Sequence, residues 1–202
     1  MSNPQLPSGY EPIDGKLYPT KELQRAAYED IRVYTSPNDR GSFLYGKKKA
    51  NKALDLAWPL DKVFITQKFG ERPAYYKKYN LPGHNGVDFR VRFIDSPLGR
   101  RHITAVSDGS IDVARADAGG YGTHIRQTLL DGSLVIYGHL TRSYVSKGQK
   151  VKKGDVIGLS GNTGDSNAPH LHLELRLSGW EKKGAKDYHG AVDPLPFLPP
   201  IK

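Results

Sequence analysis

The segment His-Leu-His-Leu-Glu-Leu-Arg-Leu, residues 170 to 177, alternates polar and apolar side chains without a break. A β-strand turns successive side chains to opposite faces, so the two histidines share one face with Glu174 and Arg176, and the four leucines share the other. Four leucines commit their face to a core, which fixes the register because a slip of one residue would bury both histidines. Two imidazoles held side by side suit a metal site with a neighbouring acid–base group. The alternative interpretation is a half-exposed strand that carries two incidental histidines.

The remainder of the chain is rich in residues typical of strands and turns. Its 202 residues include 22 glycines, 14 prolines and 12 tyrosines, but one methionine and no cysteine. From Trp58 onward, turn residues separate short apolar runs, at residues 63–66, 103–106, 110–113, 134–137 and 156–159. This texture predicts a mainly β fold built on an antiparallel sheet. Without cysteine the chain has neither disulfides nor thiolate ligands, so a zinc site must use His, Asp or Glu.

The first 55 residues differ in character and are predicted to form an appendage to a main domain at residues 56–202. Residues 1 to 18 contain several prolines and glycines and are expected to be extended. Thr20 is placed to cap a short helix through about Ile31, in which apolar residues recur at helical spacing. The appendage is also a candidate lid, in which Asn38 or Asp39 would reach the open position of a metal site.

The charge of the chain predicts attraction to polyanions, since its net charge is +9 and its pI is near 9.6. The lysines form short, scattered clusters with no recognition helix or zinc-knuckle spacing. Nucleic acid and an anionic bacterial cell wall are both candidate partners, and the absence of these features weighs against nucleic acid. No segment approaches the roughly 18 apolar residues that span a membrane, and the amino terminus lacks the features of a signal peptide. The sequence does not indicate an oligomeric state.

A second motif, Gly83-His-Asn-Gly-Val-Asp, places His84 and Asp88 four residues apart. Gly86 lets the backbone turn closely between them, so both side chains can converge on one ion. With one histidine of the 170–172 pair they make three nitrogen and oxygen ligands and leave a fourth position for water. An open fourth position is typical of a catalytic zinc site.

A third motif, Tyr137-Gly-His-Leu, places His139 directly after an apolar run, where it is a candidate acid–base group. Glu174 is a further candidate general base, with a supporting or surface role as the favoured alternative. The other histidines have no motif around them and are expected at the surface or in loops: His102, His124 and His189. The helical zinc-protease motif, the Gly-x-Ser-x-Gly elbow and the phosphate-binding P-loop are all absent from the sequence.

Together these motifs resemble the lysostaphin-like zinc endopeptidases, which cut peptide bridges in bacterial peptidoglycan. Order, spacing and flanking residues agree from Trp58 to Leu198. Besides the three motifs above, the matching stretches are Phe69-Gly-Glu-Arg, Gly119-Gly-Tyr-Gly, Lys147-Gly-Gln-Lys-Val-Lys-Lys-Gly-Asp-Val-Ile-Gly, Gly161-Asn-Thr-Gly and Val192-Asp-Pro-Leu-Pro-Phe-Leu. The segment between Asp88 and Ile103 departs from the family pattern, because it looks longer and more basic than usual.

The resemblance implies one zinc ion, with His84, Asp88 and His172 as its ligands. It also implies that His139 and His170 are the two catalytic histidines that do not bind the metal. The implied fold has a β-sheet floor under a groove walled by loops. The implied substrate is a stem or cross-bridge peptide, through either a glycine-rich bridge or a D-Ala/diamino-acid link.

All five of these positions hold the expected residue type, which favours an active enzyme at the bacterial cell wall. The alternative is a non-catalytic wall-binding or virion structural module with the same fold. Because the chain shows no signal peptide, a phage lysis or tail-associated enzyme and a processed chain are both compatible with the sequence.

Overall fold

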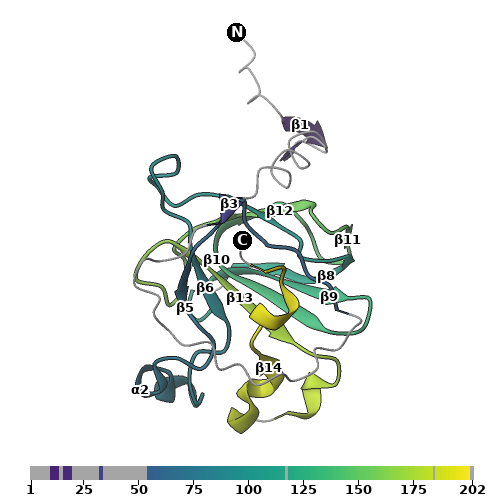
Figure 1. Cartoon of the computed structure of the whole chain (residues 1–202). Coiled ribbons are helices and arrows are strands. Elements are labelled where there is room, and N and C mark those ends of the chain that lie inside the picture. Colours follow the sequence, from purple (N-terminus) through teal and green to yellow (C-terminus); the bar gives the residue numbers. More distant parts are fainter. Residues whose placement is uncertain are drawn as a thin grey trace.

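The computed structural model describes residues 54–116, 118–183 and 185–200, together with three short strands within the first 53 residues (Figure 1). Strands dominate this part of the chain. Its single α-helix, α2 (Pro73–Tyr76), is one turn long and continues into the 3₁₀ turn η1 (Lys77–Tyr79). The prediction of a mainly β fold is confirmed.

Ten strands form one sheet, whose main path runs β11-β8-β9-β10-β13-β6-β5, with every pair in it antiparallel. Off this path, β12 pairs with β10 and β7, and β14 pairs with β13. The strand bounds are β5 Ile65–Gln67, β6 Val87–Arg90, β7 His102–Thr104, β8 Gly109–Arg115, β9 Thr123–Leu129, β10 Leu134–Ser143, β11 Lys150–Val151, β12 Val156–Ser160, β13 His170–Arg176 and β14 Ala191–Val192.

Strand β13 lies between β10 and β6, as Figure 1 shows, and carries the segment that alternates in the sequence. Leu171, Leu173 and Leu175 are at most 1% exposed and belong to the core. The middle of the polar face is buried as well, since His172 is 4% exposed and Glu174 is 0% exposed. The interpretation of a half-exposed strand is therefore wrong, because the opposite face also packs against protein.

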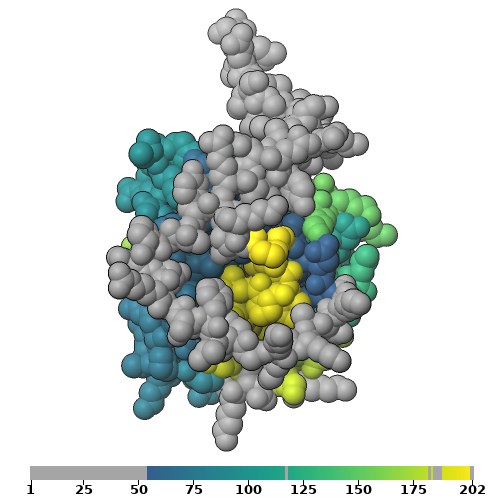
Figure 2. All heavy atoms as spheres, viewed as in Figure 1, coloured from purple at the N-terminus to yellow at the C-terminus, as the bar shows by residue number. Residues whose placement is uncertain are grey.

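The core joins the two ends of the described domain. The backbone N–H of Leu56 donates to the carbonyl oxygen of Phe197 at 3.1 Å. In Figure 2 the C-terminal residues, in yellow, lie against the dark blue residues that begin the domain. Trp58 packs edge-on against Phe89, with 6.0 Å between ring centroids. Tyr137 is fully buried in this core, where its hydroxyl donates to Gln127.

Within the first 53 residues, β1 (Tyr10–Ile13) and β2 (Lys16–Pro19) pair as an antiparallel hairpin. Strand β3 (Arg32–Val33) pairs in parallel with β4 (Lys62–Val63). The helix predicted from Thr20 to Ile31 lies outside the described residues, as do Asn38 and Asp39, and the division at residue 55 remains a prediction. Among the described residues, no helix has the length and apolar character needed to cross a bilayer.

Candidate active site

A groove of about 680 Å³ crosses the sheet beside β13. Side chains of β6, β10 and β13 form its floor, α2 and η1 contribute three tyrosines, and the segment at residues 165–169 forms another part of its wall. The lining includes all the histidines and the aspartate that the sequence singles out, His84, Asp88, His139, His170 and His172.

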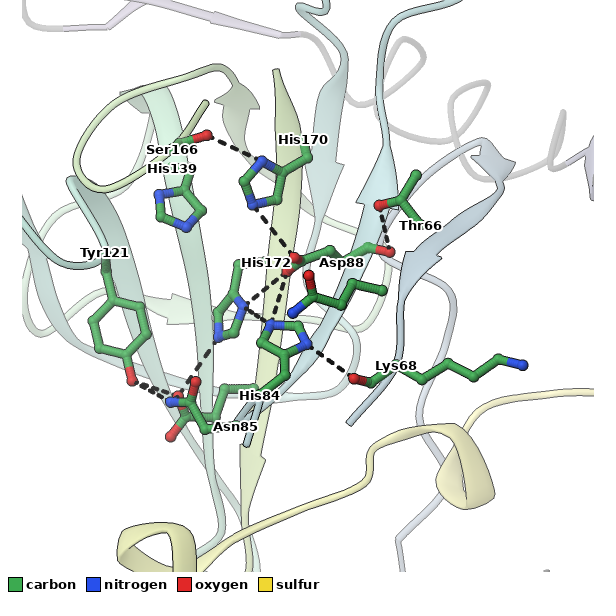
Figure 3. A network of polar contacts seen from close by, with 12 residues as sticks. Thr66, Lys68, His84, Asn85, Asp88, Tyr121, His139, Ser166, His170 and His172 are labelled. Carbon is green, nitrogen blue, oxygen red and sulfur yellow. Dashed lines mark hydrogen bonds and ion pairs between the residues drawn. The ribbon is translucent and has the colours of Figure 1, made fainter. Parts of the chain in front are cut away.

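Three potential ligand atoms converge on the groove floor, from His84, Asp88 and His172 (Figure 3). Nε2 of His84 lies 3.0 Å from Nδ1 of His172 and 3.1 Å from Oδ1 of Asp88. Nδ1 of His172 lies 3.0 Å from the same carboxylate oxygen. Zinc bonds of about 2.0–2.2 Å in tetrahedral geometry separate ligands by about 3.3 Å, so this compact triangle fits the ion. Two imidazole nitrogens and a carboxylate oxygen are also ligands that zinc accepts.

The sheet register brings these residues together. His172 on β13 lies directly opposite Asp88 on β6. His84 lies in the turn before β6, where its Nδ1 faces the carbonyl oxygen of Lys68 at 3.1 Å and leaves Nε2 for the cluster. A Cβ on Gly86 would lie 2.5 Å from the carbonyl oxygen of Leu173 and 2.6 Å from Cε1 of His172. Glycine is therefore required at this position, as the sequence predicts for a close turn.

A buried carboxylate supports His172 from behind. Oε2 of Glu174 lies 3.6 Å from Nε2 of His172 and accepts hydrogen bonds from Asn85 and Tyr121. Arg176 donates to its other oxygen. Glu174 is fully buried, so a surface role is wrong, and a positioning role fits this geometry better than that of a general base.

The electrostatics of the cluster favour its charged forms in the absence of a metal. Burial disfavours the charge on Asp88, but hydrogen bonds with His172 and His84 outweigh burial and keep the pKa of Asp88 below its usual range. Burial likewise disfavours the imidazolium of His172. The hydrogen bond with Asp88 and the nearby carboxylate of Glu174 prevail there and raise the pKa of His172 to about 9. A metal that binds Nδ1 must therefore displace a proton.

His139 and His170 lie side by side next to this cluster, with 4.5 Å between ring centroids (Figure 3). His139 follows a register shift in β10 and has a positive φ of 61°, which is uncommon for a residue other than glycine. Its Nδ1 faces the carbonyl oxygen of Thr163 at 2.8 Å. Burial, reinforced by His172 and His170, lowers the pKa of His139 to about 4. It is therefore neutral at physiological pH.

The ring of His170 is oriented in the same way. Its Nδ1 faces the carbonyl oxygen of Ala168 at 2.8 Å, and the hydroxyl of Ser166 lies 3.1 Å away. Its Nε2 lies 3.7 Å from Oδ2 of Asp88. Each of these two histidines thus has Nδ1 engaged by a backbone carbonyl, and Nε2 of His170 faces the carboxylate of the ligand cluster.

Some residues near the site could not be assigned from the sequence. Asn85 and Tyr121 hydrogen-bond each other at 2.9 Å and both contact Glu174, although tyrosines beside strands more often only pack. The surface expectation is wrong for His124, which is 1% exposed and contacts the Tyr121 ring. His102 lies in β7, and His189 is exposed as expected.

The part of the chain that carries these side chains also matches a known protein family. The chain matches the model of peptidase family M23 over residues 82–185, which is more than half of its length. The chain belongs to peptidase family M23. The match spans the turn with His84, the β10 bulge and the β13 strand, so it includes the three potential ligands and both neighbouring histidines, but not the part of the groove wall that α2 and η1 form.

Three similar proteins illustrate the relationship. The peptidoglycan DD-endopeptidase ShyA of Vibrio cholerae is 35% identical over 127 residues, which cover 60% of this chain and 27% of ShyA. The structure of the antimicrobial peptidase lysostaphin from Staphylococcus simulans is 31% identical and superposes with a TM-score of 0.54, covering 67% of this chain and 49% of lysostaphin. The structure of a zinc-containing peptidase from Vibrio cholerae is 27% identical and superposes with a TM-score of 0.54. The match covers 72% of this chain and 40% of that peptidase.

These comparisons confirm the resemblance to lysostaphin-like peptidases that the motifs indicate. The chain spans 19 to 30% of the length of three curated relatives that it matches. What those longer proteins do as a whole therefore bears on this chain only as a basis for a proposal.

Proposed function

We propose that the chain is a zinc-dependent endopeptidase that hydrolyses peptide bonds in bacterial peptidoglycan. The observation that carries this proposal is the triangle of His84 Nε2, Asp88 Oδ1 and His172 Nδ1 on the floor of a groove, beside two more histidines. These three residues would hold the ion. The zinc-containing relative and the peptidoglycan endopeptidase among the matching proteins support the choice of metal and substrate.

When bound, zinc would supply a water molecule whose pKa is lowered to about 7. Glu174 holds the ring of His172 so that Nδ1 faces the ligand cluster. The groove walls, which carry several tyrosines, would position the peptide over the ligand cluster. The arrangement therefore favours attack on a peptide carbonyl held across the floor of the groove.

His139 and His170 would move the protons. The carbonyl oxygens of Thr163 and Ala168 lie within hydrogen-bonding distance of the two Nδ1 atoms, so Nε2 is the nitrogen that each ring has left for proton transfer. One of the two rings accepts the proton of the attacking water. The other stabilises the developing oxyanion or donates a proton to the leaving amine. The geometry is compatible with either assignment.

The proposed place of action is the bacterial cell wall. A net charge of +9 favours adsorption to an anionic wall, and the groove is large enough for several residues of a peptide. Residues 56–202 would form the catalytic domain, and one zinc ion would suffice for the reaction.

The experiment incubates the full chain with purified peptidoglycan sacculi, with and without a zinc chelator, and identifies released fragments by mass spectrometry. We expect chelator-sensitive peptides with new amino termini. His139→Ala and His170→Ala should each lower the rate by about 10² to 10⁴ while the protein still binds zinc. Absence of fragments with zinc restored would favour the non-catalytic wall-binding module instead.

A further inference from the structure

We propose that Arg90 forms a carboxylate-binding subsite beside the metal centre, and that the preferred substrate carries a free carboxylate on a residue flanking the scissile bond. This inference rests on the proposed function and narrows its substrate class. It favours a cross-link through a diamino acid with a free carboxylate over a neutral glycine bridge.

The sheet register places Arg90 at the reaction centre. Arg90 on β6 lies directly opposite His170 on β13, one step along from the pairing of Asp88 with His172. Because side chains alternate along a strand, Arg90 shares the groove face with Asp88, and both line the groove. Two residues of a strand span about 7 Å, which is the length of about two residues of extended peptide. A peptide bond held over the ligand cluster thus brings its neighbouring residues within reach of Arg90.

The guanidinium of Arg90 is held in position without being neutralised. Its Nε donates to the carbonyl oxygen of Arg92 at 2.6 Å. Its central carbon lies 5.6 Å from the ring centroid of Phe64 and 5.3 Å from that of Phe93. Aromatic faces fix the plane of a guanidinium and leave its edge available for hydrogen bonds. The terminal nitrogens are therefore oriented to receive a planar, bidentate anion such as a carboxylate.

A second arginine near Phe93 differs from Arg90, because it forms ion pairs. Arg101 pairs with both Asp61 and Asp95, and its ring contact is also with Phe93. Within the part of the chain that the structure describes, no carboxylate lies within ion-pair distance of Arg90, although Arg90 is exposed to the groove. Arg101, which is outside the groove lining, is thus neutralised, whereas Arg90 in the lining has no ion pair among the described residues.

The other charges of the groove reinforce the preference for an anion. Arg72 and Arg92 also line it, and among the described residues neither has an acidic partner. The lining contains two carboxylates. Asp88 belongs to the ligand cluster, and Asp165 accepts a hydrogen bond from Tyr79 at 2.8 Å. With the metal bound, the groove is a cationic surface that favours an acidic peptide.

The test uses two peptides that are identical except for one group on the residue flanking the scissile bond, a free carboxylate in one and a carboxamide in the other. With the zinc-loaded full chain, we expect kcat/KM to favour the acid by about tenfold or more, as for a charge-assisted bidentate pair. Arg90→Gln should lower this ratio severalfold, leaving only the smaller preference that the other cationic groups of the groove supply. Arg90→Lys should give an intermediate ratio, because it keeps the charge and loses the planar fork. Arg142→Gln, an exposed arginine outside the groove, should keep the wild-type ratio.

Equal hydrolysis of the two peptides by the wild type, unchanged in Arg90→Gln, would overturn the subsite and leave the endopeptidase proposal standing. If neither peptide is hydrolysed, the proposed function fails for these substrates, and the binding of the same labelled peptides by fluorescence anisotropy decides the subsite. The subsite is supported if the wild type binds the acid peptide more tightly than the amide peptide and Arg90→Gln loses most of this difference. Equal binding of acid and amide overturns it.

Discussion

At the scale of single residues, the candidate site depends on which nitrogen of each histidine faces the cluster. His84 presents Nε2 because Lys68 engages its Nδ1, whereas His172 presents Nδ1 because Glu174 lies behind its Nε2. Alternation along residues 170–177 predicts that His170 and His172 share a face, but it does not distinguish their roles. The pairing register of β13 with β6 distinguishes the two positions, since it places His172 opposite Asp88 and His170 opposite Arg90. Such long-range pairing is not encoded in the local pattern.

Glu174 provides the first test at this scale. Glu174→Gln removes the buried charge behind His172, and we expect zinc affinity to fall by about 10- to 100-fold, as for other supporting carboxylates. The substitution also leaves Arg176 without its ionic partner, so the free energy of unfolding should fall. Zinc competition titration and urea denaturation measure the two effects. Glu181→Gln, at an exposed position, is the matched control, and equal zinc affinity in both variants would refute the positioning role.

His102 provides a test of pH dependence away from the site. Burial lowers the pKa of His102 from its ordinary value of 6.5; nearby Asp61 opposes this and Arg101 adds to it. His102 therefore binds a proton more readily in the unfolded chain than in the folded protein. The free energy of unfolding falls as the pH drops below 6.5, the unfolded pKa, and continues to fall until the pH reaches the lower pKa of the folded state. His102→Gln should lose less stability than the wild type between about pH 7.5 and about pH 5. Urea unfolding at both pH values measures this, and identical losses would contradict the expectation.

At the scale of secondary structure, the sequence predicts the strands that carry a short, largely apolar run or a regular alternation, and it misses two-residue strands and those with polar residues in the core. The predicted runs correspond to β7, β8, β10, β12 and β13, whereas the run at residues 63–66 is divided between β4 and β5. Strand β9 has no clear alternation, because His124 and Gln127 are both buried in it. Gln127 is accommodated by hydrogen bonds with Ser107 and Tyr137. Tertiary partners of this kind cannot be read from a local pattern.

Strand β10 shows a second limit of local patterns. Its apolar run ends near Tyr137, yet the strand continues to Ser143 after a register shift. His139 adopts a positive φ at this shift, and its backbone N–H donates to the carbonyl oxygen of Tyr121. A left-handed conformation at a histidine has no sequence signature, so the direction of the His139 ring could not be predicted.

The close approach of β6 and β13 can be tested through glycine. Gly86→Ala would place a methyl group against the backbone of Leu173 and the ring of His172, so it should weaken zinc binding and lower the melting temperature. Gly119→Ala is the control, because its new methyl group would meet only Asp165, at 3.9 Å. We expect the control to change stability by less than about 0.5 kcal/mol. Normal zinc binding by Gly86→Ala would contradict the packing described for this turn.

At the scale of the whole molecule, the net charge and the groove would act together on the proposed polymeric substrate. The net charge of +9 should promote adsorption to anionic sacculi, and this attraction is screened by salt. Raising the salt concentration to about 0.5 M should release much of the bound protein, while hydrolysis of a short neutral peptide should change little. A sedimentation assay with sacculi measures the bound fraction. Adsorption that is insensitive to salt would contradict an electrostatic contribution.

We propose that one metal ion, held by His84, Asp88 and His172, makes this chain a peptidoglycan endopeptidase. The most direct measurement strips the full chain of metal and follows the hydrolysis of sacculi while zinc is added back. We expect negligible hydrolysis by the stripped protein. Hydrolysis should recover fully near one zinc ion per chain in the wild type and should not recover in Asp88→Asn. Hydrolysis that survives complete removal of metal, or that Asp88→Asn retains, would contradict it.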